Sequence, residues 1–285
     1  MREGRASRTA QHNALFRALE QRLPQPLFHD PWARRFLRGR YRLLGLLPAA
    51  PLARAIDRRF PGPRAAVAVR TRYFDDALAA ALAAGIEQVV ILGAGFDSRA
   101  HRLAAMRRVP VFEVDHPATQ ALKRRVVGRG RSSSVRYVPL RLGAGGGSET
   151  DELSAALAAA GFAATARTVF LWEGVTNYLD EPTVDATLRF VARSAELLLF
   201  TYVDRAILED PTGSEGAAES IAHVRRLGEP FTWGLRPAEA ASYLAARGLE
   251  LLEDLPLSSL ARRWYGEKGP RVSTYYHVAR ARCRG

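Results

Sequence analysis

The sequence predicts an α/β fold built on a doubly wound parallel sheet that ends in an antiparallel hairpin. Short apolar segments alternate with helical patterns through most of the 285 residues. The last two apolar segments, 249–255 and 271–281, have no long helical pattern between them, and 271–281 is expected to be the last strand, at the edge of the sheet. A glycine turn, Gly93-Ala94-Gly95, directly follows the first buried strand, 88–92. Together these observations indicate seven strands, with the ligand site where parallel strands end.

Residues 1–65 predict a helical extension that precedes the sheet. Leucines recur at helical spacing in 9–23, and prolines end that helix. An Asp-Pro pair caps a second short helix, 32–37. The apolar segment 43–52 is interrupted by prolines, and we expect it to cover the core or to act as a lid. Residues 66–285 then form the main domain.

The main domain begins with a helix over 65–84, which a glycine ends. After the first strand, a helix is expected as far as Met106. The following strands are expected at 109–114, 135–140, 168–172 and 196–203. Residues 204–235 are an insertion above the sheet, on the side where a substrate would bind.

The net charge of +13 permits a nucleic-acid or anionic-membrane surface. However, the arginines are spread along the chain and lysine occurs only twice, which is typical of GC-rich coding. No apolar run is long enough to span a bilayer. Cys283 is the single cysteine, which excludes a cysteine-based metal site and fits a reducing cytoplasm. We expect a small-molecule partner, no metal, and neither nucleic acid nor membrane.

The glycine turn has the properties of a nucleotide-cofactor site. Its glycines permit a sharp turn and close approach of a ligand, and a helix N-terminus follows with Asp97 or Ser98 as N-cap. Asp115 lies twenty residues beyond Gly95 at the end of the second strand, where a carboxylate can accept ribose hydroxyls. Alternatively, the turn binds no ligand and Asp115 caps the helix that starts at Pro117.

Two adenosine cofactors remain open at this point, NAD and S-adenosylmethionine. The dinucleotide fingerprint has a third glycine where this chain has Ser98, and the pyrophosphate needs that glycine. A cofactor with an amino-acid tail and no phosphate does not need it. The terminal hairpin also fits methyltransferases better than dehydrogenases.

Several motifs, in order and at matching spacing from about residue 5 to 255, resemble the leucine carboxyl methyltransferase family. The resemblance is to its bacterial branch in particular, which includes O-methyltransferases of polyketide biosynthesis. The motifs are Ser7-Arg8-Thr9-Ala10, 70–76, 90–99, Phe112-Glu113-Val114-Asp115-His116-Pro117, 173–179 and 200–205.

The resemblance implies a class I methyltransferase with a seven-stranded Rossmann-like fold, S-adenosyl-L-methionine as cofactor, and a monomer or homodimer in a bacterial cytoplasm. Arg70, with Arg8 or Arg72, would hold the cofactor carboxylate, which suits a guanidinium. The cofactor-binding residues carried over are Arg70, Gly93, Gly95, Asp97, Asp115, Leu142 and Glu173. The family usually has Asp-Leu after the third strand, where this chain has Arg141-Leu142, and arginine cannot accept a hydrogen bond from the adenine amino group.

The resemblance further implies methylation of a carboxylate or a hydroxyl of a small secondary metabolite. A carboxylate is ionised at neutral pH and needs alignment more than a base. A phenol or alcohol would need a base, and His223 or His116 could serve. Tyr202 and Asp204, at the end of the fifth strand, are expected to touch the substrate. A non-methylating cyclisation, a nucleic-acid methyltransferase and a protein carboxyl terminus as acceptor are the alternatives.

Overall fold

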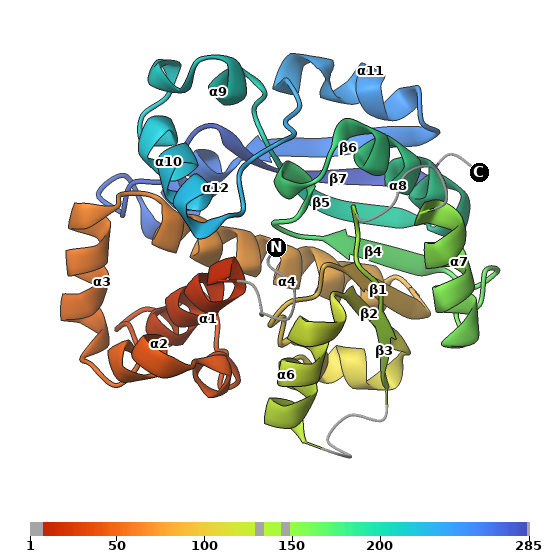
Figure 1. Ribbon diagram of the computed structural model, residues 1–285, viewed down its shortest axis with the longest axis horizontal. Coiled ribbons are helices and arrows are strands. Elements are labelled where there is room, and N and C mark those ends of the chain that lie inside the picture. The colour runs from red at the N-terminus through yellow and green to blue at the C-terminus, as the bar shows by residue number, and fades with distance from the viewer. Residues whose placement is uncertain (1–7, 129–133, 144–148, 284–285) are drawn as a thin grey trace.

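A computed structural model of the chain describes residues 8–128, 134–143 and 149–283. Its centre is a sheet of seven strands in the order β3-β2-β1-β4-β5-β7-β6 (Figure 1). The strands are β1 (Gln88–Leu92), β2 (Val111–Asp115), β3 (Val135–Pro139), β4 (Thr168–Trp172), β5 (Leu197–Val203), β6 (Leu249–Pro256) and β7 (Tyr276–Cys283). The predicted seven-stranded α/β class is confirmed.

The first five strands are parallel, and β7 is antiparallel to both β5 and β6. Two details differ from the prediction. The last strand is not an edge strand, because β7 lies between β5 and β6 and leaves β6 at the edge. A helix, α12 (Leu257–Tyr265), also intervenes between the two hairpin strands.

Helices cover both faces of the sheet. The face with Val89, Ile91 and Leu171 packs on α4 (Pro63–Ala83), α5 (Arg99–Arg102), the 3₁₀ helix η2 (Ala104–Arg108) and α12. The other face packs on α7 (Glu149–Ala159), α8 (Glu181–Ser194) and α11 (Ala240–Ala245). β1 and β4 are buried along their whole length, which explains why they are apolar without alternation. The helix expected to continue to Met106 is divided into α5 and η2.

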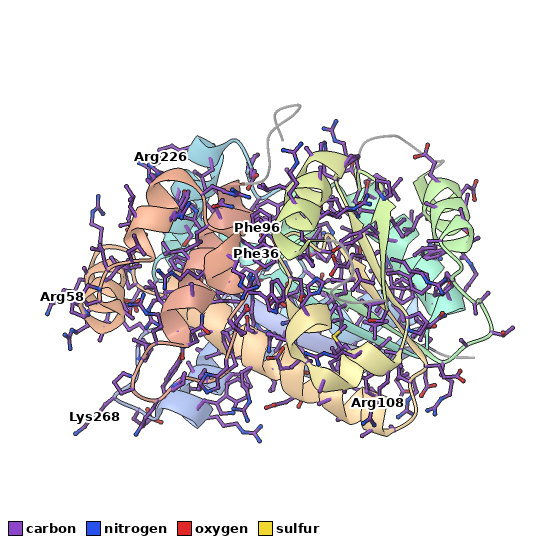
Figure 2. The ribbon with its side chains drawn as sticks, turned by 90° about the horizontal axis from the view of Figure 1, so that it is seen from below. Phe36, Arg58, Phe96, Arg108, Arg226 and Lys268 are labelled. Carbon is purple, nitrogen blue, oxygen red and sulfur yellow. The ribbon has the colours of Figure 1, made fainter. Side chains whose placement is uncertain are left out.

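The N-terminal helices form a third layer beside the carboxyl ends of the strands (Figure 1). They are α1 (Arg8–Glu20), η1 (Ala33–Phe36), α2 (Gly39–Leu44) and α3 (Ala49–Arg59). Phe36 stacks on Phe96 of the glycine turn with ring centroids 5.2 Å apart (Figure 2). Ser98 donates a hydrogen bond of 2.7 Å to the buried Asp30. These contacts fix the N-terminal layer to the turn that follows β1.

The prediction that segment 43–52 covers the core is only half right. Leu44 and Leu52 pack against the buried cluster of the N-terminal layer. Leu43, Leu46 and Leu47 instead point outward and are 67%, 55% and 45% exposed. The reason is that α2 is too short and too peripheral to turn every apolar residue inward.

The segment expected as an insertion, 204–235, contains α9 (Ala206–Glu209), the 3₁₀ helix η4 (Pro211–Gly213) and α10 (Ala217–Leu227). The chain then returns along the sheet, and Thr232 donates its backbone N–H to the carbonyl oxygen of Asn177. Among the described helices, none is sufficiently long and apolar to cross a bilayer.

Candidate cofactor and acceptor site

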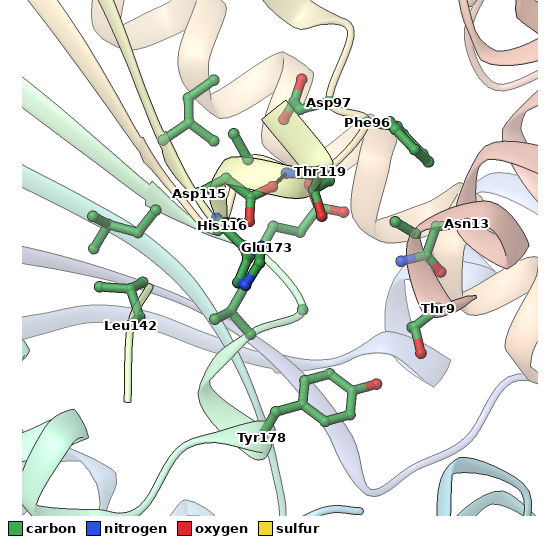
Figure 3. Close-up of a pocket in the computed structure, with 18 of the residues that line it drawn as sticks. Thr9, Asn13, Phe96, Asp97, Asp115, His116, Thr119, Leu142, Glu173 and Tyr178 are labelled. Atoms are coloured by element: carbon green, nitrogen blue, oxygen red, sulfur yellow. Dashed lines mark hydrogen bonds between the residues drawn. The ribbon is translucent and has the colours of Figure 1, made fainter. Parts of the chain in front are cut away.

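A cavity of about 470 Å³ lies at the carboxyl ends of β1, β2 and β4. Its floor is the glycine turn and the strand ends, and α1 closes its opposite side (Figure 3). Segments from both the N-terminal layer and the sheet therefore line one space. The lining includes Thr9, Asn13, Arg70, Gly93, Gly95, Asp97, Asp115, His116, Arg141, Leu142, Glu173, Tyr178 and Glu229.

The two glycines of the turn adopt conformations that other residues rarely adopt. Gly93 has φ +65° and Gly95 has φ +47°. A Cβ on Gly93 would lie 2.5 Å from a methyl group of Val175, whereas a Cβ on Gly95 would meet nothing closer than 3.8 Å. Gly93 is therefore required by the packing of the turn against the segment after β4. At Gly95, the absence of a side chain leaves the backbone accessible from the cavity.

Asp115 is held in place by the turn itself. Its Oδ2 accepts the backbone N–H of Gly95 at 2.6 Å, and its Oδ1 accepts that of His116 at 2.6 Å. Burial raises the pKa of the carboxyl, and the two backbone hydrogen bonds oppose the rise. Each oxygen retains a lone pair that can accept a hydroxyl from the cavity. His116, not Asp115, caps the next helix, because its Nδ1 accepts the N–H of Ala118.

Asp97 precedes α5, whose N-cap residue is Ser98 and whose first residue is Arg99. The Oδ1 of Asp97 accepts the backbone N–H of Arg99 at 2.7 Å, and its Oδ2 contacts the guanidinium at 2.5 Å. Burial would raise the pKa of the Asp97 carboxyl, yet Arg99 and the nearby Lys123 hold that pKa far below its usual range. Asp97 is thus a fixed negative charge at the edge of the cavity.

Glu173, at the end of β4, bridges two buried arginines. Its Oε1 accepts the Nε of Arg70 at 2.8 Å, and its Oε2 contacts the Nη2 of Arg99 at 2.7 Å. Burial acts to raise the pKa of the Glu173 carboxyl, but the arginines lower it overall. A Cβ on Gly174, at φ +70°, would lie 3.1 Å from Arg70, so the glycine gives the guanidinium its space.

A buried ion pair lies beneath Asp115. The Nζ of Lys123, on α6 (Pro117–Val127), is 2.6 Å from Oε2 of Glu113 on β2, and both side chains are fully buried. Burial raises the pKa of the Glu113 carboxyl to about 7, against the effect of the ammonium. The ammonium also acts to lower the pKa of Asp97 and of Asp115. The pair links α6 to the strand that ends in Asp115.

The opposite side of the cavity carries hydroxyl and amide groups beside the carboxylate of Glu229. Thr9 and Asn13 project from α1 toward the space that Tyr178 faces from the segment after β4 (Figure 3). The Thr9 hydroxyl donates to Glu229, and burial raises the pKa of the Tyr178 phenol. This side has the polarity needed to orient an acceptor molecule.

Arg141 and Leu142 follow β3 and line the same cavity. The guanidinium of Arg141 is exposed, and no ion pair or hydrogen bond of its side chain occurs in the described part of the chain. The other lining arginines, Arg17, Arg70, Arg99 and Arg102, are each paired with a carboxylate. Arg141 is thus the unpaired cation among the described lining residues.

Four residues expected near the site lie elsewhere. Asp204 lies outside the cavity lining, and its Oδ1 accepts the backbone N–H of Ala206. Tyr202 is fully buried, and its hydroxyl donates to Asp254 at 2.5 Å, away from the cavity. His223, on α10, faces the rings of His12 and Phe60 outside the cavity lining. Arg72 pairs with Asp76 on the surface of α4. The side chain of Arg8 lies outside the described part of the structure.

Sequence reasoning gave no role to several residues that build the site. Arg99 was only part of a motif, yet it joins Asp75, Asp97 and Glu173. Lys123 could have been singled out from the sequence, because lysine is rare in this arginine-rich chain and occurs only twice.

The comparisons with known proteins agree with this geometry. Residues 10–192 match the leucine carboxyl methyltransferase family. A Streptomyces coelicolor protein assigned as an S-adenosyl-L-methionine-dependent methyltransferase is 32% identical over 275 residues, which cover 92% of each chain. A Mycobacteroides abscessus protein with the same assignment is 30% identical, covering 89% of this chain and 87% of its own.

The crystal structure of a DUF574 family protein from Streptomyces avermitilis shares the fold. It has a TM-score of 0.63 at 16% identity and covers 98% of both chains. The family match spans more than half of this chain, and the relatives span nearly all of it. The chain is therefore a member of the leucine carboxyl methyltransferase family and an S-adenosylmethionine-dependent methyltransferase.

Proposed function

We propose that the protein transfers a methyl group to an oxygen atom, first of all a carboxylate, of a small bacterial secondary metabolite. The observation that most supports this proposal is the distribution of charged and polar groups over the residues that line the cavity. Fixed charged groups stand at the strand ends, and the hydroxyl and amide groups of Thr9, Asn13 and Tyr178 stand across the cavity beside Glu229. One side suits a charged cofactor, and the other suits a small acceptor.

The residues of the strand ends fit S-adenosylmethionine. Asp115 offers two oxygens with free lone pairs for the ribose hydroxyls, and Arg70 reaches the cavity with Nη atoms that Glu173 does not use. Glu173 and Asp97 supply negative charge that complements a sulfonium. When bound, the cofactor supplies an electrophilic methyl group. The open backbone at Gly95 gives its methionine tail room.

The protein's own contribution is alignment and exclusion of water. A carboxylate acceptor is already nucleophilic at neutral pH, so the site needs no base for it. Of the two histidines considered as bases, His223 lies outside the cavity lining, and His116 lines it with its Nδ1 already accepting the N–H of Ala118. Thr9, Asn13 and Tyr178 can orient the acceptor by hydrogen bonds, and α1 closes the space above it.

The test has two steps. Calorimetry measures binding of S-adenosylmethionine to the wild-type protein, to Asp115→Asn and to the surface control Asp151→Asn. The protein is then incubated with the cofactor and a panel of small carboxylic acids, phenols and alcohols, and products are analysed by mass spectrometry. A methyl ester supports the proposal, and a methyl ether moves the acceptor class to hydroxyls. A converted product without an added methyl group would overturn methyl transfer.

A further inference from the structure

The outer surface of the N-terminal layer carries much of the unexplained charge of this protein. Residues 31–60 contain eight arginines and one acid, Asp57, so they hold +7 of the net +13. That aspartate is not free, because it pairs with Arg64. The charge is therefore concentrated in one layer of the fold, although arginines occur along the whole chain.

The same surface carries the exposed large apolar residues of the described chain, Leu43, Leu46 and Leu47. They stand at the turn between α2 and α3, and exposed arginines flank the turn on both sides. We call this set the arginine–leucine face, and it consists of Arg38, Arg40, Arg42, Leu43, Leu46, Leu47, Arg54, Arg58 and Arg59. Its six arginines form no ion pair with any described acid.

The arginine–leucine face points away from the sheet and the cavity. In Figure 1, α2 and α3 lie at the end of the molecule remote from α7 and α8, and Figure 2 shows Arg58 reaching outward there. On α3, the exposed positions Pro51, Arg54, Ala55 and Arg58 recur at helical spacing, while Ala49 and Ala53 are buried. The helix is thus basic on its outer side and packed on its inner side.

We propose that the arginine–leucine face binds the surface of an anionic membrane. A protruding apolar tip with flanking cations combines the two contributions that hold a peripheral protein on lipid, insertion of apolar side chains and attraction to anionic headgroups. A protein partner fits this face less well. Its apolar part consists of leucines, which are under-represented among the residues that dominate binding at protein interfaces, and the set contains no Trp or Tyr.

The expectation of no membrane partner rested on the lack of a spanning segment. Contact at the surface of a bilayer needs no such segment. The proposal is also independent of the methyl acceptor, because none of the residues of the arginine–leucine face lines the cavity.

The test is flotation of the full-length protein with vesicles of phosphatidylcholine alone or mixed equally with phosphatidylglycerol. We expect the protein to float with the anionic vesicles only and to be released by high salt. The triple variant R54Q/R58Q/R59Q should lose about fivefold in partition for each arginine removed. The variant L43S/L46S/L47S should lose at least tenfold with its positive charge intact.

The control is R107Q/R108Q/R125Q, which removes three exposed, unpaired arginines from η2 and α6, none of them in the arginine–leucine face. Figure 2 shows Arg108 at the opposite end of the molecule from Arg58. It should float like the wild type. Equal loss in this control would overturn the proposal, because overall charge and not this face would then cause binding. Absence of flotation with the wild type, or capture by an acidic protein but not by vesicles, would overturn it as well. Circular dichroism and cofactor affinity verify that each variant is folded.

Discussion

The backbone N–H of Gly95 donates a hydrogen bond of 2.6 Å to Oδ2 of Asp115. This contact joins the turn after β1 to the end of β2, so the two elements that we propose contact the cofactor cannot move independently. The carboxylate is oriented before a ligand arrives, which lowers the entropic cost of binding. The glycine and the aspartate therefore act as one unit.

The first prediction concerns Asp115→Asn. The amide keeps the size of the side chain but loses the charge and one acceptor oxygen. We expect affinity for S-adenosylmethionine to fall about 10- to 100-fold, the range for a hydrogen bond to a charged acceptor. Calorimetry gives the affinity, and Asp151→Asn, an exposed substitution on α7, serves as control. Unchanged affinity in Asp115→Asn would rule out the ribose role.

The second prediction compares two arginines on one helix. Arg70 is buried at the cavity, whereas Arg72 pairs with Asp76 at the surface. Arg70→Met should raise the KM for S-adenosylmethionine about 10- to 100-fold, because the site loses a guanidinium for the cofactor carboxylate. Arg72→Met should leave that KM within about twofold, since a surface ion pair contributes little. An equal rise in KM for both variants would contradict the assignment of the cofactor carboxylate to Arg70.

Local patterns predicted much of this fold. β1 and β4 are continuous apolar runs, and the glycine turn is encoded by consecutive residues, so both were readable without the rest of the chain. The position of β7 in the sheet could not be predicted from local patterns, because its pairing with β5 and β6 joins residues far apart in sequence. Tyr202 was misplaced for the same reason. It lies opposite His277 of β7, and that pairing encloses it.

The candidate site divides in the same way. Asp115 was predicted because the chain carries it a fixed distance from Gly95. The ion pairs of Glu173 with Arg70 and Arg99 were not predicted, because they form only when three separate segments of the chain have folded together. Thr9 and Tyr178 lie in two motifs of the family resemblance, but only the structure places them on the same cavity, where we propose that they contact the acceptor.

The third prediction concerns the ion pair beneath the site. Lys123→Met leaves the Glu113 carboxyl buried without its partner, and the unfolding free energy should fall by about 3–5 kcal/mol. The double variant Lys123→Met, Glu113→Leu removes both charges and should recover most of that loss, because the desolvation cost disappears with them. Urea denaturation measures both. Equal losses in the single and double variants would show that packing, and not charge, explains the effect.

The fourth prediction is a pH dependence of stability. Burial lowers the pKa of His101 from 6.5 to about 4, assisted by Lys123 and opposed by Asp97 and Asp30. Between about pH 6.5 and pH 4, the His101 imidazole is therefore protonated in the unfolded chain and neutral in the folded chain. The contribution of His101 is fully present above pH 6.5 and is lost as the pH falls toward 4, by about 3 kcal/mol.

The matched variant for this prediction is His101→Leu, which cannot titrate. Its stability should be flatter than that of the wild type between pH 6.5 and pH 4, as measured by urea denaturation at several pH values. Identical pH profiles for the two proteins would show that other groups, such as the buried carboxylates, cause the dependence.

The last prediction separates the two glycines of the turn. Gly93→Ala places a methyl group 2.5 Å from Val175 at φ +65°, whereas Gly95→Ala at φ +47° meets only ordinary contacts, with Ala10 and the Gly93 carbonyl oxygen at 3.8 Å. Both substitutions cost about 1 kcal/mol for the left-handed conformation, and Gly93→Ala should cost a further 1–3 kcal/mol for the overlap. Adding Val175→Ala to Gly93→Ala should recover the overlap but not the conformational cost. Gly95→Ala should instead weaken cofactor binding with little further loss of stability, because its new methyl group faces the cavity where the methionine tail would lie.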